Sequence, residues 1–258
     1  MSRIKSAFEN KKAFIAFVTG GDPDLETTEA LIPQMAEAGA DLIEIGIPFS
    51  DPIAEGIVIQ EADVRALKAQ TTTDKLFDMV KRVRERVDIP LVFMTYVNPI
   101  YTYGTEKFMK RCAECGIDGV IVPDVPFEEH DEVKGACKAQ GVELISMIAP
   151  TSKERINMIA KEAEGFLYCV SSLGVTGVRS KITTNIKEMV DQVKAVSDIP
   201  CAIGFGISTP VQAKEMAAVS DGAIVGSAIV KIIAQHGKNC IEPVCAYVKE
   251  MKAAVATA

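Results

Sequence analysis

The sequence predicts a closed (β/α)8 barrel, an α/β fold in which eight parallel strands are each followed by a helix. Short apolar runs alternate with helical patterns eight times along the 258 residues. The runs are apolar throughout, which is typical of parallel strands that are buried on both faces. No Gly/Ser-rich linker and no block of charge divides the chain. We therefore expect residues 1–258 to form one domain, the usual extent of such a barrel.

A doubly wound open sheet is the alternative fold. It usually carries the fingerprint G-x-G-x-x-G after its first strand. Here the first apolar run, 13–18, is followed by TGGDPD, which lacks that spacing. This difference favours the barrel.

The first half of the chain predicts four strand–helix units. Its apolar runs predict strands at 13–18, 42–47, 91–96 and 119–122. Apolar residues at helical spacing predict helices at 24–38, 59–68, 73–87, 105–114 and 128–140. Three of these helices are followed by glycines that suit a helix C-terminus, Gly39, Gly116 and Gly141.

The second half predicts four more units. Strands are expected at 142–148, 165–170, 201–206 and 222–225. Helices are expected at 152–163, 186–196, 209–219, 227–235 and 242–252, with Pro210 at the first helical position of the third. The chain also repeats a short pattern of helix end, Gly or Ser, Asp and strand, as AGADLIEI, CGIDGVIV and VSDGAIV. Such repetition is what a ring of similar units requires.

The composition excludes several classes of function. The formal net charge is −7, which argues against a surface for nucleic acid or an anionic membrane. No apolar run approaches the ~18 residues of a membrane-spanning helix. The start of the chain is basic but has no apolar segment before Phe14, so it does not indicate a secretory signal. We expect a cytoplasmic protein.

The seven cysteines are scattered from Cys112 to Cys245. An odd number at wide spacings favours reduced, buried thiols over a disulfide framework. Cys112 and Cys115 form a C-x-x-C inside a helical pattern, but no second pair follows, and His130 and His236 lie far apart. A structural zinc ion needs four ligands, so we expect no metal site.

Glu44 is the most unusual residue, because it interrupts the apolar strand LIEIGI. A charge there costs several kcal/mol unless it is paired or faces a cavity. One interpretation is a structural carboxyl, bonded to backbone or to a tyrosine hydroxyl. The other is an acid–base group whose pKa is raised by its apolar neighbours Ile43, Ile45 and Ile47.

Small residues follow the last two predicted strands. In a barrel these strand ends carry the site, and the helix that begins near Ser227 directs its N-terminal dipole there. Gly204, Gly206 and Gly226 would let an anion approach backbone N–H groups. The pattern predicts a phosphate site, although glycines that merely form tight turns would look the same.

Other polar residues at strand ends are ambiguous. Tyr96 and Tyr168 are equally consistent with core packing, and Asp51 and Asp124 with turns. The segments 49–58 and 171–185 are long for strand–helix loops. Long loops of this kind are often lids that exclude water from a reaction.

Several motifs together resemble the tryptophan synthase alpha chain family. They are IEIGIPFSDPIAEG, YVNPIY, PDVP, SSLGVTGVRS, IGFGIS and GSAIVKII, and in order they cover essentially the whole chain. The resemblance implies a (β/α)8 barrel that cleaves indole-3-glycerol phosphate to indole and glyceraldehyde 3-phosphate. It also implies a beta chain as partner in an alpha2beta2 complex. Pyridoxal phosphate is expected in that beta chain, and no cofactor in this one.

The resemblance also implies roles for individual residues. Glu44 matches the catalytic glutamate, and Thr176 matches the threonine of a closing lid. The resemblance and the strand ends together predict substrate contacts at Phe17, Tyr96, Tyr168, Thr176, Gly177, Gly204, Phe205, Gly206, Gly226 and Ser227.

The chain departs from the family pattern in the loop after the Glu44 strand. The family reads Ala-Asp-Gly-Pro, whereas this sequence has Ala54-Glu55-Gly56-Ile57. The family aspartate binds the indole N–H and stabilises positive charge on the ring. Glu55 is therefore the second candidate catalytic residue, one methylene longer, and we expect Glu55→Asp to raise the activity of the isolated chain.

Two other functions remain open at this point. One is another phosphate-binding barrel of the same pathway, such as an isomerase or a synthase. Those enzymes usually need a Lys or Cys at a strand end, and no predicted strand end here offers a Lys. The other is a barrel that mainly binds and activates a beta-type partner, for which the change at Glu55 and Ile57 is the only support.

Overall fold

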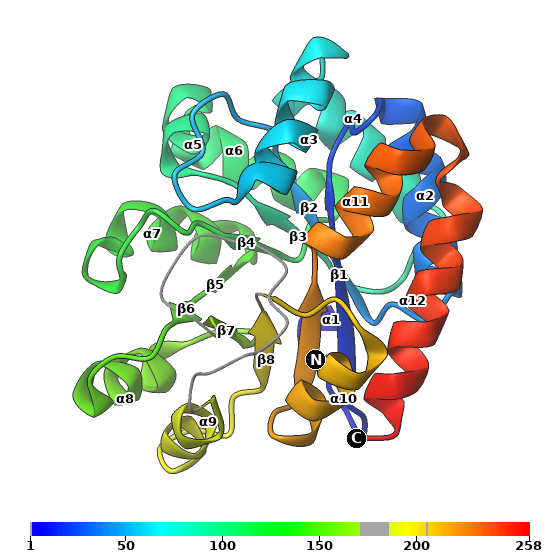
Figure 1. Ribbon diagram of the computed structural model, residues 1–258. Coiled ribbons are helices and arrows are strands. Elements are labelled where there is room, and N and C mark those ends of the chain that lie inside the picture. Colours follow the sequence, from blue (N-terminus) through cyan, green and yellow to red (C-terminus); the bar gives the residue numbers. More distant parts are fainter. Residues whose placement is uncertain (1, 171–185, 205) are drawn as a thin grey trace.

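The computed structural model describes residues 2–170, 186–204 and 206–258, and it confirms the barrel (Figure 1). Nine strands form one sheet in the order β5-β4-β3-β2-β1-β9-β8-β7-β6, and every strand pairing is parallel. The strands are β1 (Ala13–Thr19), β2 (Leu42–Gly46), β3 (Leu91–Met94), β4 (Gly119–Ile121), β5 (Glu143–Ile145), β6 (Met147–Ile148), β7 (Leu167–Val170), β8 (Cys201–Gly204) and β9 (Gly222–Val225).

The ring closes at its fifth position, where the sequence predicts one strand and the structure has two. β5 and β6 are separated by Ser146 alone, so the two ends of the sheet order are consecutive in the chain. β5 pairs with β4, and β6 pairs with β7. The backbone N–H of Tyr168 donates to the carbonyl oxygen of Ser146 at 3.0 Å and supports this junction. The nine strands therefore fill eight positions, as predicted.

Helices surround the ring (Figure 1). They are α1 (Arg3–Ser6), α2 (Leu25–Glu37), α3 (Ile57–Lys68), α4 (Thr73–Arg84), α5 (Val97–Tyr103), α6 (Thr105–Cys115), α7 (Asp131–Gln140), α8 (Lys153–Glu162), α9 (Ile186–Lys194), α10 (Pro210–Ala218), α11 (Ser227–His236) and α12 (Ile241–Ala256), with 3-10 turns η1 (Phe127–Glu129) and η2 (Gly237–Asn239). None of the described helices is long and apolar enough to cross a membrane.

The short helix α5 was not predicted from the sequence. Pro99 lies in the first turn of α5, where a missing N–H removes no bond. The carboxylate of Asp124 accepts the Val97 N–H at 3.0 Å and so completes the helix start. The strand predicted at 91–96 is correspondingly shorter and ends at Met94.

The core has two layers, which follow from the alternation of side chains along each strand. Ile43 and Ile45 belong to the large cluster between sheet and helices, whereas Leu42 belongs to the cluster inside the barrel. Glu44 has the same parity as Leu42, so it points into the barrel. The inner cluster also includes Ile4, on α1, which closes the barrel at the starts of the strands.

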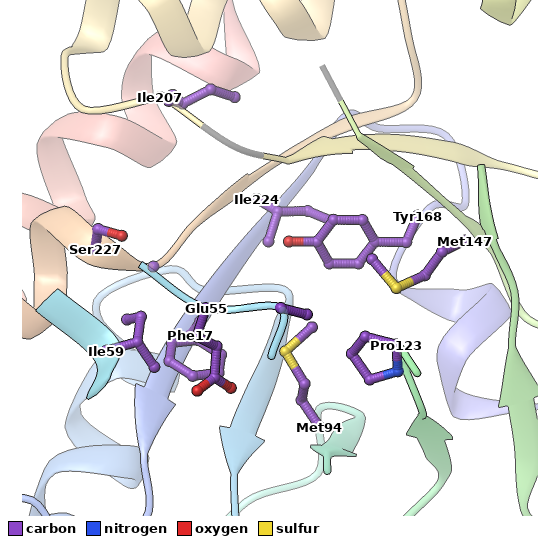
Figure 2. A pocket seen from close by; sticks show the side chains of 13 residues that line it. Phe17, Glu55, Ile59, Met94, Pro123, Met147, Tyr168, Ile207, Ile224 and Ser227 are labelled. Carbon is purple, nitrogen blue, oxygen red and sulfur yellow. The ribbon is translucent and has the colours of Figure 1, made fainter. Parts of the chain in front are cut away.

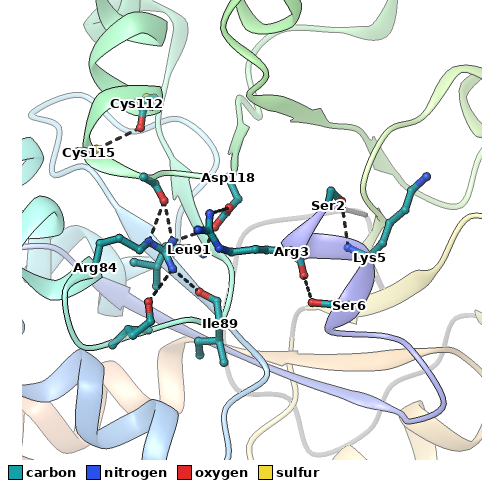
Figure 3. Close-up of polar contacts among 12 residues, drawn as sticks. Ser2, Arg3, Lys5, Ser6, Arg84, Ile89, Leu91, Cys112, Cys115 and Asp118 are labelled. Carbon is teal, nitrogen blue, oxygen red and sulfur yellow. Dashed lines mark hydrogen bonds and ion pairs between the residues drawn. The ribbon is translucent and has the colours of Figure 1, made fainter.

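A polar network below the barrel ties α1 to the neighbouring strand starts (Figure 3). Arg84 donates to the carbonyl oxygens of Gly116, Val87 and Ile89 and to Asp118. Arg3 reaches the same carboxylate at 3.0 Å. This network lies at the end of the barrel opposite the site described next, so we assign it to stability.

Candidate active site

A cavity of about 710 Å³, counted with its open mouth, lies at the carboxyl ends of the strands (Figure 2). Figure 2 shows Tyr168 and Met147 on one side and Ile59 and Ser227 on the other. The lining is mostly apolar and consists of Phe17, Ala54, Glu55, Ile59, Met94, Pro123, Met147, Tyr168, Gly206, Ile207, Ile224, Gly226 and Ser227.

Glu44 lies beside this cavity inside the barrel and is 0% exposed. It is the register partner of Phe17, and its charge acts on Tyr168, so both of these cavity residues lie near it. Neither carboxyl oxygen has a hydrogen bond to any described residue. Burial alone raises the pKa of Glu44 to about 8. The structural interpretation, a carboxyl bonded to backbone or tyrosine, therefore finds no partner among the described residues.

Glycines make room for the aromatic rings of the site. A Cβ on Gly46 would lie 2.7 Å from the ring of Phe17, and one on Gly226 would lie 3.2 Å from it. A Cβ on Gly204 would lie 2.5 Å from the ring of Tyr168. Gly204 is absent from the cavity lining and leaves room for Tyr168, and its predicted contact with substrate stays a prediction.

The starts of two helices near the cavity differ in a way that matters for anions. At α10, Thr209 and Gln212 form a capping box that uses the N-terminal N–H groups. At α11, the preceding residue Gly226 provides no side-chain cap. The first N–H groups of a helix have no partner within the helix, and their dipole favours negative charge. Because Gly226 and Ser227 line the cavity, the start of α11 offers an anion site there.

Glu55 reaches the cavity from the loop that follows β2. Its side chain is hydrogen-bonded to Asp63 and to Tyr96, and burial is the main cause that raises its pKa. The Tyr96 hydroxyl also accepts the Ala54 N–H at 3.0 Å. Tyr96 is only 2% exposed and is absent from the cavity lining. It therefore holds the loop in place, and its predicted contact with substrate stays a prediction.

Asp63 is the polar residue of the site that the sequence analysis missed. It lies on α3 and is 3% exposed. Burial raises its pKa to about 9, and the charge of Glu55 and a hydrogen bond with Glu55 add to the effect. The buried residues Ile59, Ala62 and Ala66 share its face of α3. A carboxylate at such a position in an amphipathic pattern was the signal available in the sequence.

Three other acids at strand ends form contacts with neighbouring residues. Asp124 caps α5, as described above. Asp51 accepts a hydrogen bond from Ser50 on the exposed surface. Asp22 is buried and forms a two-point ion pair with Arg65, at 2.7 and 2.8 Å. This pair fixes α3 to the turn that follows β1.

Three predicted substrate contacts, Thr176, Gly177 and Phe205, lie outside the described residues. The proposed lid at 171–185 does so as well, and these remain predictions. Among the described residues, no group of three or more His, Cys, Asp or Glu side chains could hold a metal ion. All seven cysteines are free thiols, and Cys112 and Cys115 are both buried.

Comparison with known proteins gives one consistent result. The family model described as tryptophan synthase alpha chain matches residues 4–256. The chain is 44% identical over 255 residues to the tryptophan synthase alpha chain of Lacticaseibacillus casei, covering 99% of this chain and 96% of that one. It is 48% identical over 237 residues to that of Lactiplantibacillus plantarum, covering 92% and 90%.

Solved structures agree. The tryptophan synthase subunit alpha of Legionella pneumophila superposes with a TM-score of 0.89 at 35% identity, covering 100% of both chains. A chain of Mycobacterium tuberculosis tryptophan synthase also gives a TM-score of 0.89, at 32% identity, covering 99% of this chain and 98% of that chain.

Proposed function

Because this chain belongs to the tryptophan synthase alpha chain family, we propose that the cavity beside Glu44 is where it cleaves its substrate. The family reaction is the lyase reaction that splits indole-3-glycerol phosphate into indole and glyceraldehyde 3-phosphate. The indole is then passed to a beta subunit for tryptophan synthesis. Each residue role below is part of the proposal.

Glu44 is the group that moves the protons. The reaction is a retro-aldol cleavage, in which indole C3 gains a proton and the hydroxyl on the attached side-chain carbon loses one. With a pKa of about 8, Glu44 holds a proton at neutral pH and can donate it to C3. The resulting carboxylate accepts the hydroxyl proton. As the carbon–carbon bond breaks, its electrons return to the ring and the side chain leaves as an aldehyde. Glu44 ends the cycle protonated.

The surrounding cavity fits the rest of the substrate. Phe17, Met94 and Ile59 offer apolar contacts for an indole ring. Glu55 supplies the carboxylate for the ring N–H, which carries positive charge after C3 is protonated. Gly206, Gly226 and Ser227 border the uncapped start of α11, where backbone N–H groups can bind the phosphate without Lys or Arg.

One observation carries this proposal, namely a buried carboxyl without a hydrogen-bond partner among the described residues, next to an apolar cavity with an anion site. The experiment is to measure indole and glyceraldehyde 3-phosphate released from indole-3-glycerol phosphate by the purified chain, alone and with a beta chain. Equimolar release of both products is expected in both cases. Failure to release either product, even with the beta chain, would overturn the proposal. Release only with the beta chain would show that the partner completes the site, as the partner-activating interpretation requires.

A surface beside the cavity fits the partner. Large apolar side chains are exposed at Ile53 (74%), Ile57 (65%) and Tyr101 (79%), in the loop after β2, at the start of α3 and on α5. The bond between Ala54 and Tyr96 holds this loop against the start of α5. Exposed apolar clusters are typical of protein interfaces. We assign this surface to the beta chain, in a cytoplasmic alpha2beta2 complex of single-domain alpha chains.

This chain needs no cofactor for the mechanism above, since every proton step uses its own carboxyl groups. The pyridoxal phosphate of the complex then belongs to the beta chain.

A further inference from the structure

Glu55 and Asp63 form a pair of carboxyl groups at the edge of the cavity. Glu55 lines the cavity, whereas Asp63 lies behind it on α3 and is 3% exposed. A side-chain hydrogen bond joins the two. Two ionised carboxylates cannot donate a hydrogen bond to each other, so the contact requires one proton between them.

The neighbours of the pair explain where that proton resides. The Phe49 backbone N–H donates to Asp63, and Tyr96 is hydrogen-bonded to Glu55. Oε2 of Glu55 is buried and has no partner among the described residues. Burial and the charge of Glu55 both raise the pKa of Asp63, to about 9. Burial and the charge of Glu55 outweigh the Phe49 N–H, which favours ionised Asp63, so the arrangement favours a proton on Asp63 and the charge on Glu55.

In the described part of the chain, no cation forms an ion pair with Glu55 or Asp63. Asp22 acts on Asp63 as a further negative charge, and its own partner is Arg65. Helix α11 packs on α3, but its titratable residues Lys231 and His236 are exposed. β1 has no titratable side chain. The charge on the pair is thus set mainly by the pair itself, together with Tyr96 and Asp22.

We propose that Asp63 is a positioning residue for the cleavage reaction, which shares one proton with Glu55 and holds the Glu55 carboxylate toward the bound ring. This inference rests on the role proposed above for Glu55. A longer acid in the loop needs a second group to fix its direction, and Asp63 supplies it as a donor from the rigid helix. Loss of the shared proton would leave two adjacent negative charges, which repel and turn Glu55 away.

The test uses the complex with the beta chain and follows kcat and KM for indole release from pH 6 to 10. Two variants are compared, Asp63→Asn and Asp63→Ala, with Glu61→Gln as the control because Glu61 is exposed on the same helix. An amide donates its hydrogen bond at every pH, whereas alanine donates none. Asp63→Ala should lower kcat by about 10- to 100-fold with little change in KM, as a misplaced group does.

The pH profile separates positioning from a structural role. In the wild type, both Glu44 and the pair lose a proton at high pH, so log kcat should fall with a limiting slope of about −2 above pH 9. In Asp63→Asn only Glu44 titrates, and the slope should be about −1. The control should keep the wild-type slope.

An infrared difference spectrum at pH 7 reports the proton directly. Wild type minus Asp63→Asn should show the carbonyl stretch of one protonated carboxyl group, and wild type minus Glu61→Gln should not. Absence of that band, or a slope that Asp63→Asn leaves unchanged, would overturn the inference. Full activity in Glu55→Gln would instead overturn the role of Glu55, because the band does not depend on catalysis.

Discussion

Phe17 and Glu44 are register partners in the parallel strands β1 and β2, so the ring that lines the cavity and the buried carboxyl project into the barrel at the same height. The ring lies where Gly46 and Gly226 leave space for it. An aromatic side chain beside the carboxyl keeps water away from it, and burial is what raises its pKa. Phe17 thus both lines the cavity and helps to raise the pKa of Glu44.

Replacing the carboxyl should stop the reaction without unfolding the chain. In Glu44→Gln the side chain keeps its shape but can neither donate nor accept the proton at pH 7. We expect kcat to fall by at least about 10²- to 10⁴-fold, with an unchanged circular dichroism spectrum. Glu143→Gln makes the same chemical change in strand β5 and should keep full activity. Near-wild-type turnover by Glu44→Gln would rule out its assignment.

The rate should depend on pH through the same group. The cycle begins with protonated Glu44, whose pKa is about 8. Below pH 8 the group is mostly protonated, and above pH 8 the active form is lost. We therefore expect kcat to be level near pH 7 and to begin to fall near pH 8, by about tenfold per pH unit until the Glu55–Asp63 pair also titrates and the fall steepens. A rate that rises through pH 8 would mean that the ionised form begins the cycle.

The free energy of unfolding should fall as the pH rises, which is the opposite of the effect of a salt-bridged acid. The pKa of Glu44 is about 8 in the fold, above its ordinary value of 4.5. Below pH 4.5 the group is protonated in both states. As the pH rises toward 8, the unfolded chain ionises while the folded chain does not, and the free energy of unfolding falls. Urea unfolding at pH 5, 6.5 and 8 should show a steeper decline in the wild type than in Glu44→Gln. Parallel curves would contradict a raised pKa.

The contacts of Glu55 reverse the expectation drawn from its sequence position. Glu55→Asp restores the family residue, which suggested a gain in activity for the isolated chain. In the structure, however, the longer side chain is bonded to Asp63 and Tyr96. An acid that is shorter by one methylene withdraws from both contacts. We expect kcat to fall about tenfold. A gain would show that the loop does not depend on these bonds.

The phosphate site should respond to added negative charge. In Ser227→Asp a carboxylate would occupy the start of α11, and at ~4 Å from a phosphate the repulsion amounts to a few kcal/mol. We expect KM to rise by about 100-fold or more, while kcat changes little. Ser152→Asp is the matched control, because Ser152 caps α8 away from the cavity lining. Equal effects of the two variants would place the phosphate elsewhere.

Much of this arrangement could be predicted from the sequence, because parallel strands buried on both faces stand out as continuous apolar runs. Glu44 was evident for the same reason, since it is a single charge in such a run, although the sequence left a structural and a catalytic interpretation open. The division of the fifth strand at Ser146 was not evident, because it depends on pairing with two different neighbours. Asp63 was missed because an amphipathic helix tolerates acids, and only the folded loop brings Glu55 against it.

The closed lower end of the barrel limits where Glu44 can obtain a proton. Ile4 of α1 is fully buried in the inner cluster, so among the described residues the cavity side is the way by which the Glu44 carboxyl can exchange with bulk water. A bound substrate blocks that route. The proton that Glu44 gives to indole C3 must then be replaced from the hydroxyl of the same substrate molecule. Each turnover therefore needs no proton from the solvent.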